Sequence, residues 1–340
     1  MTEITKFVAD DYHCYLPLHY VIDIGNVCNL QCPFCFTGVR TPGVKRKTMS
    51  LKNFQVIFEK LKAHARQIDL YSWGEPFLNK YFLNMVSICA EQNIHTHIDS
   101  TLSSMNMDHD YCEKLVNSGL SSIFVSLDGT TQEVYEKYRV GAELETSLAN
   151  IKNLTAAKKR LGKLNPKLAI AFYVHKHNEH QIQSAKDLAK ELNINIWFKF
   201  LACDLDWQSS LHGTESEHFH VPNWVTQYYP LPHHREFNDI RFHQTVQNVI
   251  SACRQPFNSM VINWDGTVTP CTTVTGEKYV IGNLLENELD EVWNNTHYKS
   301  SREFLLNYGE PQNTGSVCES QTCPLTKKHE KDIPIMFLSK

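Results

Sequence analysis

No stretch of the sequence approaches the roughly 18 consecutive apolar residues that a membrane-spanning helix needs. The first residues, Met1–Lys6, lack the basic and apolar regions of a secretory signal. Neither sign of charge dominates, because 33 basic and 37 acidic side chains leave a formal net charge of −4. The basic surplus that typifies nucleic-acid-binding proteins is therefore missing. These absences predict a cytoplasmic protein with no membrane and no nucleic-acid partner.

Low-complexity segments are also lacking, and so is a disulfide framework. The chain has eleven cysteines, and an odd count argues against complete pairing. In a cytoplasmic protein, cysteines are more often metal ligands or buried thiols than disulfides. The 340 residues are 42% hydrophobic, which is enough for a sizeable core in one or two domains.

From residue 20 onward, an apolar strand followed by an amphipathic helix recurs six times. The predicted strands are Tyr20–Ile24, Ile68–Tyr71, His95–Asp99, Ser122–Leu127, Leu168–Val174 and Ile194–Leu201. Ser50 is predicted to cap the first of the helices between them. Repeats of this kind form parallel sheets with helices outside, and six are too few for the closed eight-fold barrel. The predicted fold class is α/β, a partial (β/α)6 TIM-like barrel with ligands at the carboxyl ends of its strands.

The rhythm stops after Leu201, and a small cysteine-rich unit follows. Asp265-Gly266 between two short apolar runs predicts a β-hairpin, and Leu289–Leu306 shows a helical pattern. We expect five segments: an N-terminal arm (1–19), a core barrel (20–202), a linker facing the substrate (203–252), a small C-terminal domain (253–325) and a tail (326–340).

Three cysteines directly follow the first predicted strand. Cys28, Cys32 and Cys35 have C-x3-C-x2-C spacing, so their thiolates can reach one metal centre from a single loop. Three ligands leave one iron of a 4Fe-4S cluster open to a small molecule. A zinc knuckle is the alternative, but zinc sites usually pair cysteines and need a fourth ligand nearby.

The cysteine loop and two further motifs resemble those of the radical SAM superfamily. Gly74-Glu75-Pro76 after the second strand is similar to the family's Gly-Glu-Pro motif, although Trp73 replaces its usual first glycine. Ser126-Leu127-Asp128-Gly129 after the fourth strand is similar to a segment near the cofactor. The resemblance implies that a 4Fe-4S cluster on the three cysteines binds S-adenosyl-L-methionine. The residues that it places at the cofactor are Phe34, Gly74, Glu75, Pro76, Ser126, Asp128 and Arg139.

A second set of cysteines lies in the C-terminal unit, namely Cys253, Cys271, Cys318 and Cys323. Four thiolates also suit a tetrahedral zinc ion. The surrounding pattern is similar to the SPASM/twitch extensions of radical SAM enzymes. Because a full SPASM extension has about seven cysteines, the resemblance implies the shorter twitch form with one auxiliary 4Fe-4S cluster.

The resemblance implies that a 5′-deoxyadenosyl radical abstracts hydrogen from an unactivated C–H bond. Oxidation by dehydrogenation or crosslinking, epimerisation, and rearrangement or elimination are the outcomes we consider. For epimerisation, Cys203 is the candidate hydrogen-atom donor and Asp204 a candidate proton acceptor. The expected substrate is a carbohydrate-like small molecule or a peptide, and the expected electron donor is flavodoxin-like or ferredoxin-like.

Peptide-modifying relatives often carry an N-terminal domain that binds a leader peptide. Only 27 residues precede Cys28, so a peptide maturase of this kind would need a separate leader-binding protein. The alternative of another class is a zinc-stabilised binding protein without catalysis.

Overall fold

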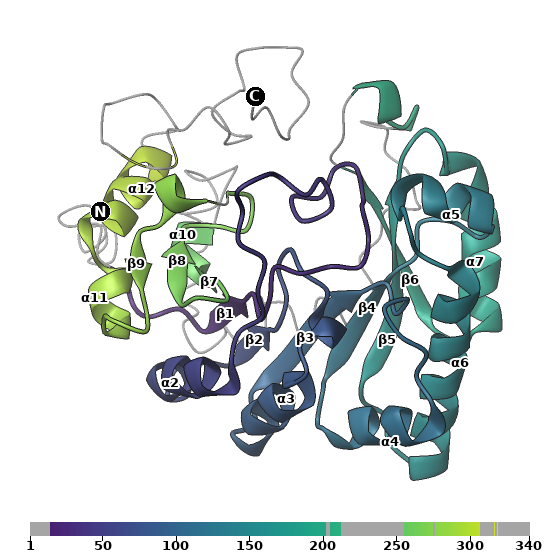
Figure 1. Cartoon of the computed structure of the whole chain (residues 1–340), viewed down its shortest axis with the longest axis horizontal. Coiled ribbons are helices and arrows are strands. Elements are labelled where there is room, and N and C mark those ends of the chain that lie inside the picture. The colour runs from purple at the N-terminus through teal and green to yellow at the C-terminus, as the bar shows by residue number, and fades with distance from the viewer. Residues whose placement is uncertain are drawn as a thin grey trace, which may run out of the picture.

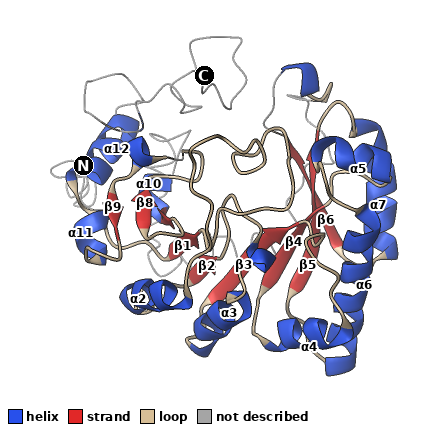
Figure 2. Ribbon diagram, viewed as in Figure 1, coloured by secondary structure: helices blue, strands red, loops and turns tan. Residues whose placement is uncertain are grey.

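The computed structural model describes residues 14–201, 205–211, 255–274 and 276–306, together with Ser316 and Cys318. Within these residues, strands and helices alternate along the chain, and the helices cover the outside of one sheet (Figures 1 and 2). No helix of the described part combines the length and the apolar character that crossing a bilayer requires.

Six parallel strands form the core of the sheet, and all six sequence-based predictions are confirmed. The strands are β1 (His19–Ile22), β2 (Gln67–Asp69), β3 (His95–Ser100), β4 (Ser122–Ser126), β5 (Lys167–Val174) and β6 (Asn195–Phe200). Each pairs in parallel with the next in sequence. The sheet is a partial barrel, as the fold class predicts, and its strands end on the same side.

The helices between the strands follow the hydrophobic pattern of the sequence. They are α2 (Leu51–Leu61), α3 (Phe82–Glu91), α4 (His109–Asn117), α5 (Gln132–Tyr138), α6 (Leu144–Leu161) and α7 (Ile182–Glu191). Short 3-10 turns lie at η1 (Pro76–Leu78), η2 (Glu179–Gln181) and η3 (Leu205–Trp207). Ser50 caps α2, and its side chain accepts a hydrogen bond from the Asn53 amide. α5 has no counterpart among the helices predicted from the sequence.

The predicted hairpin is present, and it continues the barrel sheet. It consists of β7 (Ser259–Ile262) and β8 (Thr267–Thr269), preceded by α10 (Gln255–Asn258) and followed by η5 (Glu277–Tyr279) and β9 (Gly282–Asn283). Because β7 pairs in parallel with β1, the described strands form one sheet in the order β6-β5-β4-β3-β2-β1-β7-β8-β9. The first strand of the chain thus lies between β2 and the C-terminal unit.

The helical pattern at 289–306 forms two helices, where the sequence predicts one. They are α11 (Leu289–Trp293) and α12 (Thr296–Leu306). The Asn295 side chain accepts a hydrogen bond from the Tyr298 amide and starts the second helix. Asparagine competes with the helical backbone in this way, which explains the break.

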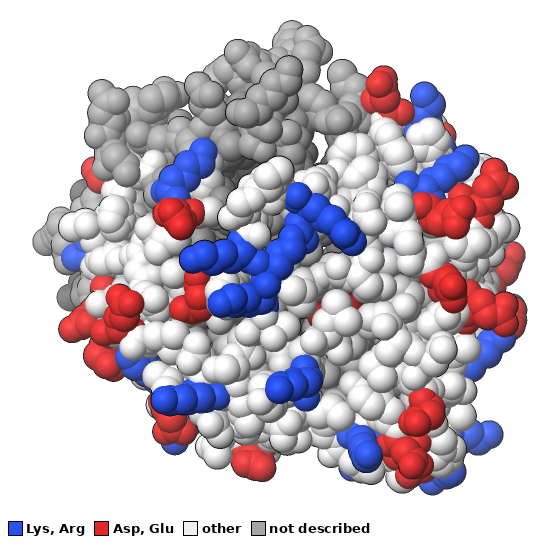
Figure 3. All heavy atoms as spheres, in the orientation of Figure 1, with Lys and Arg blue, Asp and Glu red and all other residues white. Residues whose placement is uncertain are grey.

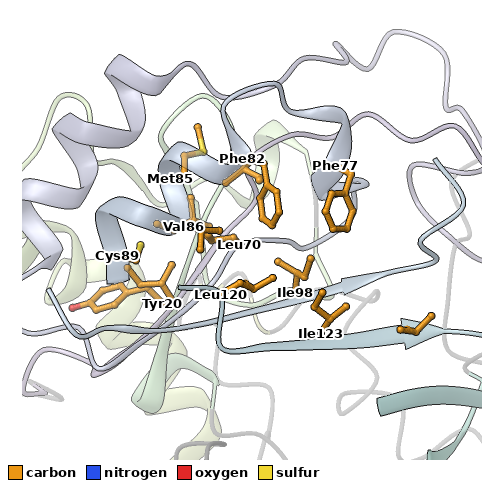
Figure 4. Close-up of a cluster of buried hydrophobic side chains, with 14 of the residues drawn as sticks. Tyr20, Leu70, Phe77, Phe82, Met85, Val86, Cys89, Ile98, Leu120 and Ile123 are labelled. Atoms are coloured by element: carbon orange, nitrogen blue, oxygen red, sulfur yellow. The ribbon is translucent and has the colours of Figure 1, made fainter. Parts of the chain in front are cut away.

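The two faces of the sheet have different cores, because successive strand residues point to opposite sides. The face toward the helices is mostly apolar, with Thr96 as a buried polar exception. Residues of α3 such as Met85 and Val86 lie against Tyr20, Leu70 and Ile98 of the sheet side (Figure 4). The other face carries a separate cluster in which Ala169 and Ala171 pack with aromatic side chains. The helix-facing side therefore forms the main apolar core, whereas the other face also carries buried polar side chains such as Asp69 and His97.

Candidate active site

Five residues separate the end of β1 from Cys28, which begins the cysteine loop at the carboxyl end of the sheet. Its backbone is held by a bond from the Gln31 amide to the Val140 carbonyl. Gly38 lies directly on Cys32, because an added Cβ would be 2.3 Å from the Cys32 carbonyl oxygen. Cys32 is buried, whereas Cys28 and Cys35 are partly exposed. The loop therefore presents its thiols from a tightly packed backbone.

The three thiols act on one another without meeting at one point. Burial, followed by Glu75 and the other two thiols, raises the pKa of Cys28 to about 12. Among the described residues, no three His, Cys, Asp or Glu side chains converge as the ligands of a single metal ion do. In an iron–sulfur cluster each thiolate binds a different iron, so the ligands are spread apart. The donor set fits such a cluster better than one zinc ion, and bound metal deprotonates its thiols.

Gly74 brings the end of β2 onto the segment that precedes the cysteine loop. A Cβ at Gly74 would lie 1.6 Å from the Gly25 carbonyl oxygen, so no other residue fits this position without rearrangement. The next amide, of Glu75, donates to the Val27 carbonyl at 2.8 Å. Pro76 then starts η1, for which the Glu75 side chain is the cap. These contacts place Glu75 beside the loop of Cys28.

The Glu75 carboxyl group is buried and accepts hydrogen bonds from two sides. The Ser100 hydroxyl donates to its Oε1 at 2.8 Å, and the Phe77 amide donates to the same oxygen at 3.3 Å. Burial outweighs these bonds and raises the pKa of Glu75 to about 7. A cationic group next to this carboxyl would favour its charged form. Ser100 was not predicted as a site residue, because its only signal in the sequence is that it is polar and directly follows a predicted strand.

Trp73 joins the first cysteine loop to the C-terminal unit. Its indole Nε1–H donates to the Thr272 carbonyl oxygen at 2.9 Å. Its own carbonyl oxygen lies 4.0 Å from the Cys35 Sγ atom. Because Thr272 follows Cys271, one residue contacts the neighbourhoods of both predicted cluster sites. Trp73, which replaces the usual glycine of the motif, therefore connects the cysteine loop with the C-terminal unit.

Asp128 and Arg139 form a buried ion pair at the end of β4. The Arg139 Nε atom donates to Asp128 Oδ2 at 2.5 Å, and the Tyr173 amide donates to Oδ1 at 2.6 Å. Burial raises the pKa of Asp128, and Arg139 opposes this effect. Arg139 Nη1 also lies 4.0 Å from the Cys32 Sγ atom. Ser126, the last residue of β4, accepts a long bond from Tyr135 through its carbonyl. The pair thus borders the cysteine loop.

Phe34 lies in an aromatic cluster with residues that the sequence analysis did not select. Its ring stacks on Tyr138 with centroids 6.4 Å apart, and it meets Trp207 edge-on at 5.3 Å. Trp207 in turn contacts His175 at 5.2 Å. Phe34 is buried in these contacts, so ordinary packing accounts for most of its environment.

Two of the four predicted auxiliary ligands are described. Cys271 follows β8, and its Sγ atom lies 3.0 Å from the Thr273 hydroxyl. The Cys318 amide donates to the Ser316 hydroxyl. Burial raises the pKa of Tyr298, and both thiols add to this shift, so both lie near that phenol. Cys253 and Cys323 lie outside the described residues, as do Cys203 and Asp204. Cys89 and Cys112 are buried in helices, as expected.

Comparisons with known proteins agree with this geometry. Residues 22–189 match the model of the radical SAM superfamily, and residues 253–324 match that of SPASM, an iron-sulfur cluster-binding domain. The sporulation killing factor maturation protein SkfB of Bacillus subtilis is 20% identical over 304 residues, which cover 84% of this chain and 67% of SkfB.

A cysteine-type anaerobic sulfatase-maturating enzyme of Clostridium novyi is 24% identical over 314 residues, which cover 83% of this chain and 80% of that protein. Among solved structures, Streptococcus suis SuiB bound to S-adenosylmethionine superposes with a TM-score of 0.64 at 18% identity, covering 96% of this chain and 75% of SuiB.

Proposed function

Because the chain belongs to the radical SAM superfamily and carries a SPASM domain, we propose that it oxidises a peptide at an unactivated C–H bond. Its cofactors are S-adenosyl-L-methionine, the 4Fe-4S cluster that binds it, and auxiliary iron–sulfur clusters. When bound, these groups supply one-electron chemistry that removes a hydrogen atom from carbon. The cytoplasmic setting and a flavodoxin-like or ferredoxin-like electron donor are parts of the same proposal.

The observation that carries the proposal is the contact of Arg139 with both Asp128 and the Cys32 thiol. In the proposal, Cys28, Cys32 and Cys35 hold the cluster. Arg139 faces the carboxylate of the cofactor, because it keeps further N–H donors beyond the one given to Asp128. Burial of these groups strengthens their charge interactions and excludes water from a reactive centre.

The remaining motif residues orient the other end of the cofactor. The Glu75 carboxyl, whose pKa is raised by burial, would accept a hydrogen bond from the methionyl ammonium and be ionised beside it. Gly74 and Pro76 set the direction of this carboxyl through the backbone, and Ser126 borders the cofactor from β4. Phe34 acts through packing, since Tyr138 and Trp207 surround its ring.

Oxidation requires an acceptor for a second electron after the hydrogen atom has left. We assign Cys253, Cys271, Cys318 and Cys323 to one auxiliary cluster that serves this purpose. The bond from Trp73 to Thr272 supports this assignment, because it ties the Cys271 segment to the first cysteine loop. In an epimerisation no electron would leave, and Cys203 would return a hydrogen atom to the substrate.

A peptide is the substrate class that the relatives favour. SkfB is named for maturing a killing factor, another similar protein is a PqqA peptide cyclase, and SuiB has been solved with the precursor peptide SuiA. We therefore rank a peptide above a carbohydrate-like small molecule. The alternative in which a separate leader-binding protein presents the peptide stays a hypothesis.

Anaerobic reconstitution tests the proposal. We expect about eight irons per chain, cleavage of S-adenosylmethionine on reduction, and a substrate peptide that becomes lighter by two hydrogens. A colourless protein with stoichiometric zinc would contradict the enzyme. A peptide whose mass is unchanged in ordinary water but gains one deuterium in heavy water, with the gain lost in Cys203→Ala, would replace oxidation by epimerisation.

A further inference from the structure

The cysteine loop lies in a part of the sequence that has no acidic residue. Between Asp23 and Glu59 there is no Asp or Glu, whereas five basic residues occur there: Arg40, Lys45, Arg46, Lys47 and Lys52. The whole chain has a formal net charge of −4, whereas the charge of this segment is positive. A local positive charge of this kind creates an electrostatic potential at the surface that attracts a negatively charged partner.

Hydrogen bonds hold the basic segment against the cysteine loop. Asn26, two residues before Cys28, donates to the Lys45 carbonyl at 2.7 Å and accepts from the Lys47 amide at 2.8 Å. On the other side of the loop, Arg46 Nη1 donates to the Thr37 carbonyl at 2.7 Å, two residues after Cys35. These bonds hold the backbone of Lys45 and Lys47 and the guanidinium of Arg46 beside the two ends of the cysteine loop.

We call Arg40, Lys45, Arg46 and Lys47 the basic patch. Figure 3 shows Lys and Arg side chains gathered on one face, over the loop that follows β1. Arg40, Lys45 and Lys47 are exposed, and Lys47 lies 6.0 Å from the centre of the Trp264 ring. Within the described residues, none of the four forms an ion pair. Their charge is thus not cancelled by a neighbour in this part of the chain.

We propose that the basic patch docks an acidic one-electron carrier protein of the flavodoxin or ferredoxin kind. The inference rests on the proposed function, because it gives the cluster of Cys28, Cys32 and Cys35 a source of electrons. In the docked complex one electron passes from the reduced carrier to the oxidised cluster, and no bond forms or breaks. The patch borders the loop that holds the cluster, so a carrier seated on it is brought next to the acceptor.

Electrostatic complementarity acts mainly on the rate of encounter, and salt screens it beyond about 8 Å at physiological ionic strength. The proposal therefore predicts a steep salt dependence for reduction by the carrier. A neutral small reductant has no such steering. If the patch instead bound an acidic peptide or RNA, reversing its charge would leave the rate of reduction by the carrier unchanged. This outcome separates those partners from the one proposed.

Charge reversal tests the patch with the reconstituted full-length protein. Lys45→Glu/Lys47→Glu is compared with Lys114→Glu/Lys163→Glu, which reverses two exposed lysines on α4 and after α6. Stopped-flow absorbance follows cluster reduction by reduced flavodoxin and by photoreduced deazaflavin, a neutral reductant. We expect the first pair to slow reduction by flavodoxin at least about tenfold at low salt, with little difference at about 1 M salt. The control pair and the deazaflavin rates remain unchanged.

An unchanged flavodoxin rate in Lys45→Glu/Lys47→Glu would overturn the proposal. If deazaflavin also reduces that variant more slowly, the charge reversal has damaged the protein and the milder Lys45→Gln/Lys47→Gln is used instead. We expect flavodoxin to reduce this milder variant at a rate between those of the wild type and the reversal. The affinity of flavodoxin for the protein, measured by calorimetry, is a second readout without turnover, and equal affinity for wild type and reversal would also overturn the proposal. Failure of the proposed function is distinct, because it would show as a missing cluster or as an unoxidised peptide, whereas the docking proposal is judged by the reduction rate and the affinity for flavodoxin.

Discussion

The indole N–H of Trp73 donates to the carbonyl oxygen of Thr272 across 199 positions of sequence, at 2.9 Å. Trp73 belongs to the motif after β2, and Thr272 follows Cys271, a predicted auxiliary ligand. The bond thus joins the barrel to the SPASM domain beside both predicted cluster sites. Pairing of β1 with β7 brings the two segments together, because it makes the hairpin part of the same sheet.

Trp73→Phe removes the donor and keeps an aromatic ring. A hydrogen bond of this kind contributes about 1 kcal/mol, so we expect amide hydrogen exchange at 271–274 to become about fivefold faster in the holoprotein. Iron content should stay near that of the wild type, while the spectroscopic signal of the auxiliary cluster changes. Trp197→Phe on β6 is the matched control and should leave both measurements unchanged. Equal exchange in Trp73→Phe and wild type would show that the bond has no effect on this segment.

Arg139→Met leaves the Asp128 carboxylate without its partner. Breaking a buried ion pair typically costs about 3–5 kcal/mol, and we expect a loss of this size in denaturant unfolding. Without Arg139 the pKa of Asp128 rises further, so the variant should lose more stability as the pH increases. Asp128→Asn/Arg139→Met removes both charges and should recover part of the loss. Binding of S-adenosylmethionine, measured by calorimetry, should weaken in both variants.

Glu75 makes folding stability depend on pH. Its pKa is about 7 in the folded protein, against an ordinary value of 4.5. Between these values the unfolded chain has released the proton that the folded chain keeps, so stability falls as the pH rises from about 4.5 to 7. The full difference corresponds to about 3 kcal/mol. Glu75→Gln should flatten this part of the stability curve of the protein without cofactors.

Asp23 is a second buried carboxyl group that contributes to the pH dependence of stability. Burial raises its pKa to about 7 as well, so both carboxyls contribute to the slope. Asp23→Asn and Glu75→Gln should each remove part of the slope, and the double variant most of it. Glu143→Gln, at an exposed position, is the control. A slope unchanged in the double variant would contradict the role of burial.

Gly74→Ala tests the close approach between the motif and the β1 loop. Its Cβ would lie 1.6 Å from the Gly25 carbonyl oxygen, and backbone has to move to relieve the overlap. We expect a loss of at least about 3 kcal/mol in unfolding free energy and weaker binding of S-adenosylmethionine. Gly162→Asn is the control, since nothing lies within 4 Å of an added Cβ there and asparagine tolerates a positive φ. Equal stability of both variants would contradict this account of Gly74.

Much of the site could be predicted because its groups follow strands that are easy to recognise. The thiols follow β1, Gly74 and Glu75 follow β2, and Asp128 follows β4. Parallel strands end at the same edge of a sheet, so these motifs had to meet. The partners of the motifs were not predictable, because a lone Ser100 or Trp207 has no sequence pattern of its own. Roles for Cys203, Asp204, Cys253 and Cys323 stay predictions, since these residues lie outside the described part.

The sequence by itself determined the family, the partial barrel and the order of motifs, because hydrophobic periodicity and cysteine spacing are local properties. Only the tertiary structure decided that the C-terminal hairpin extends the barrel sheet and that Trp73 contacts Thr272 and Cys35 beside the two predicted cluster sites. It also decided that Asp128 pairs with Arg139 and that the basic patch borders the cysteine loop. These relationships join residues distant in sequence. Composition and spacing allow many such pairs, and strand pairing and burial determine which of them form.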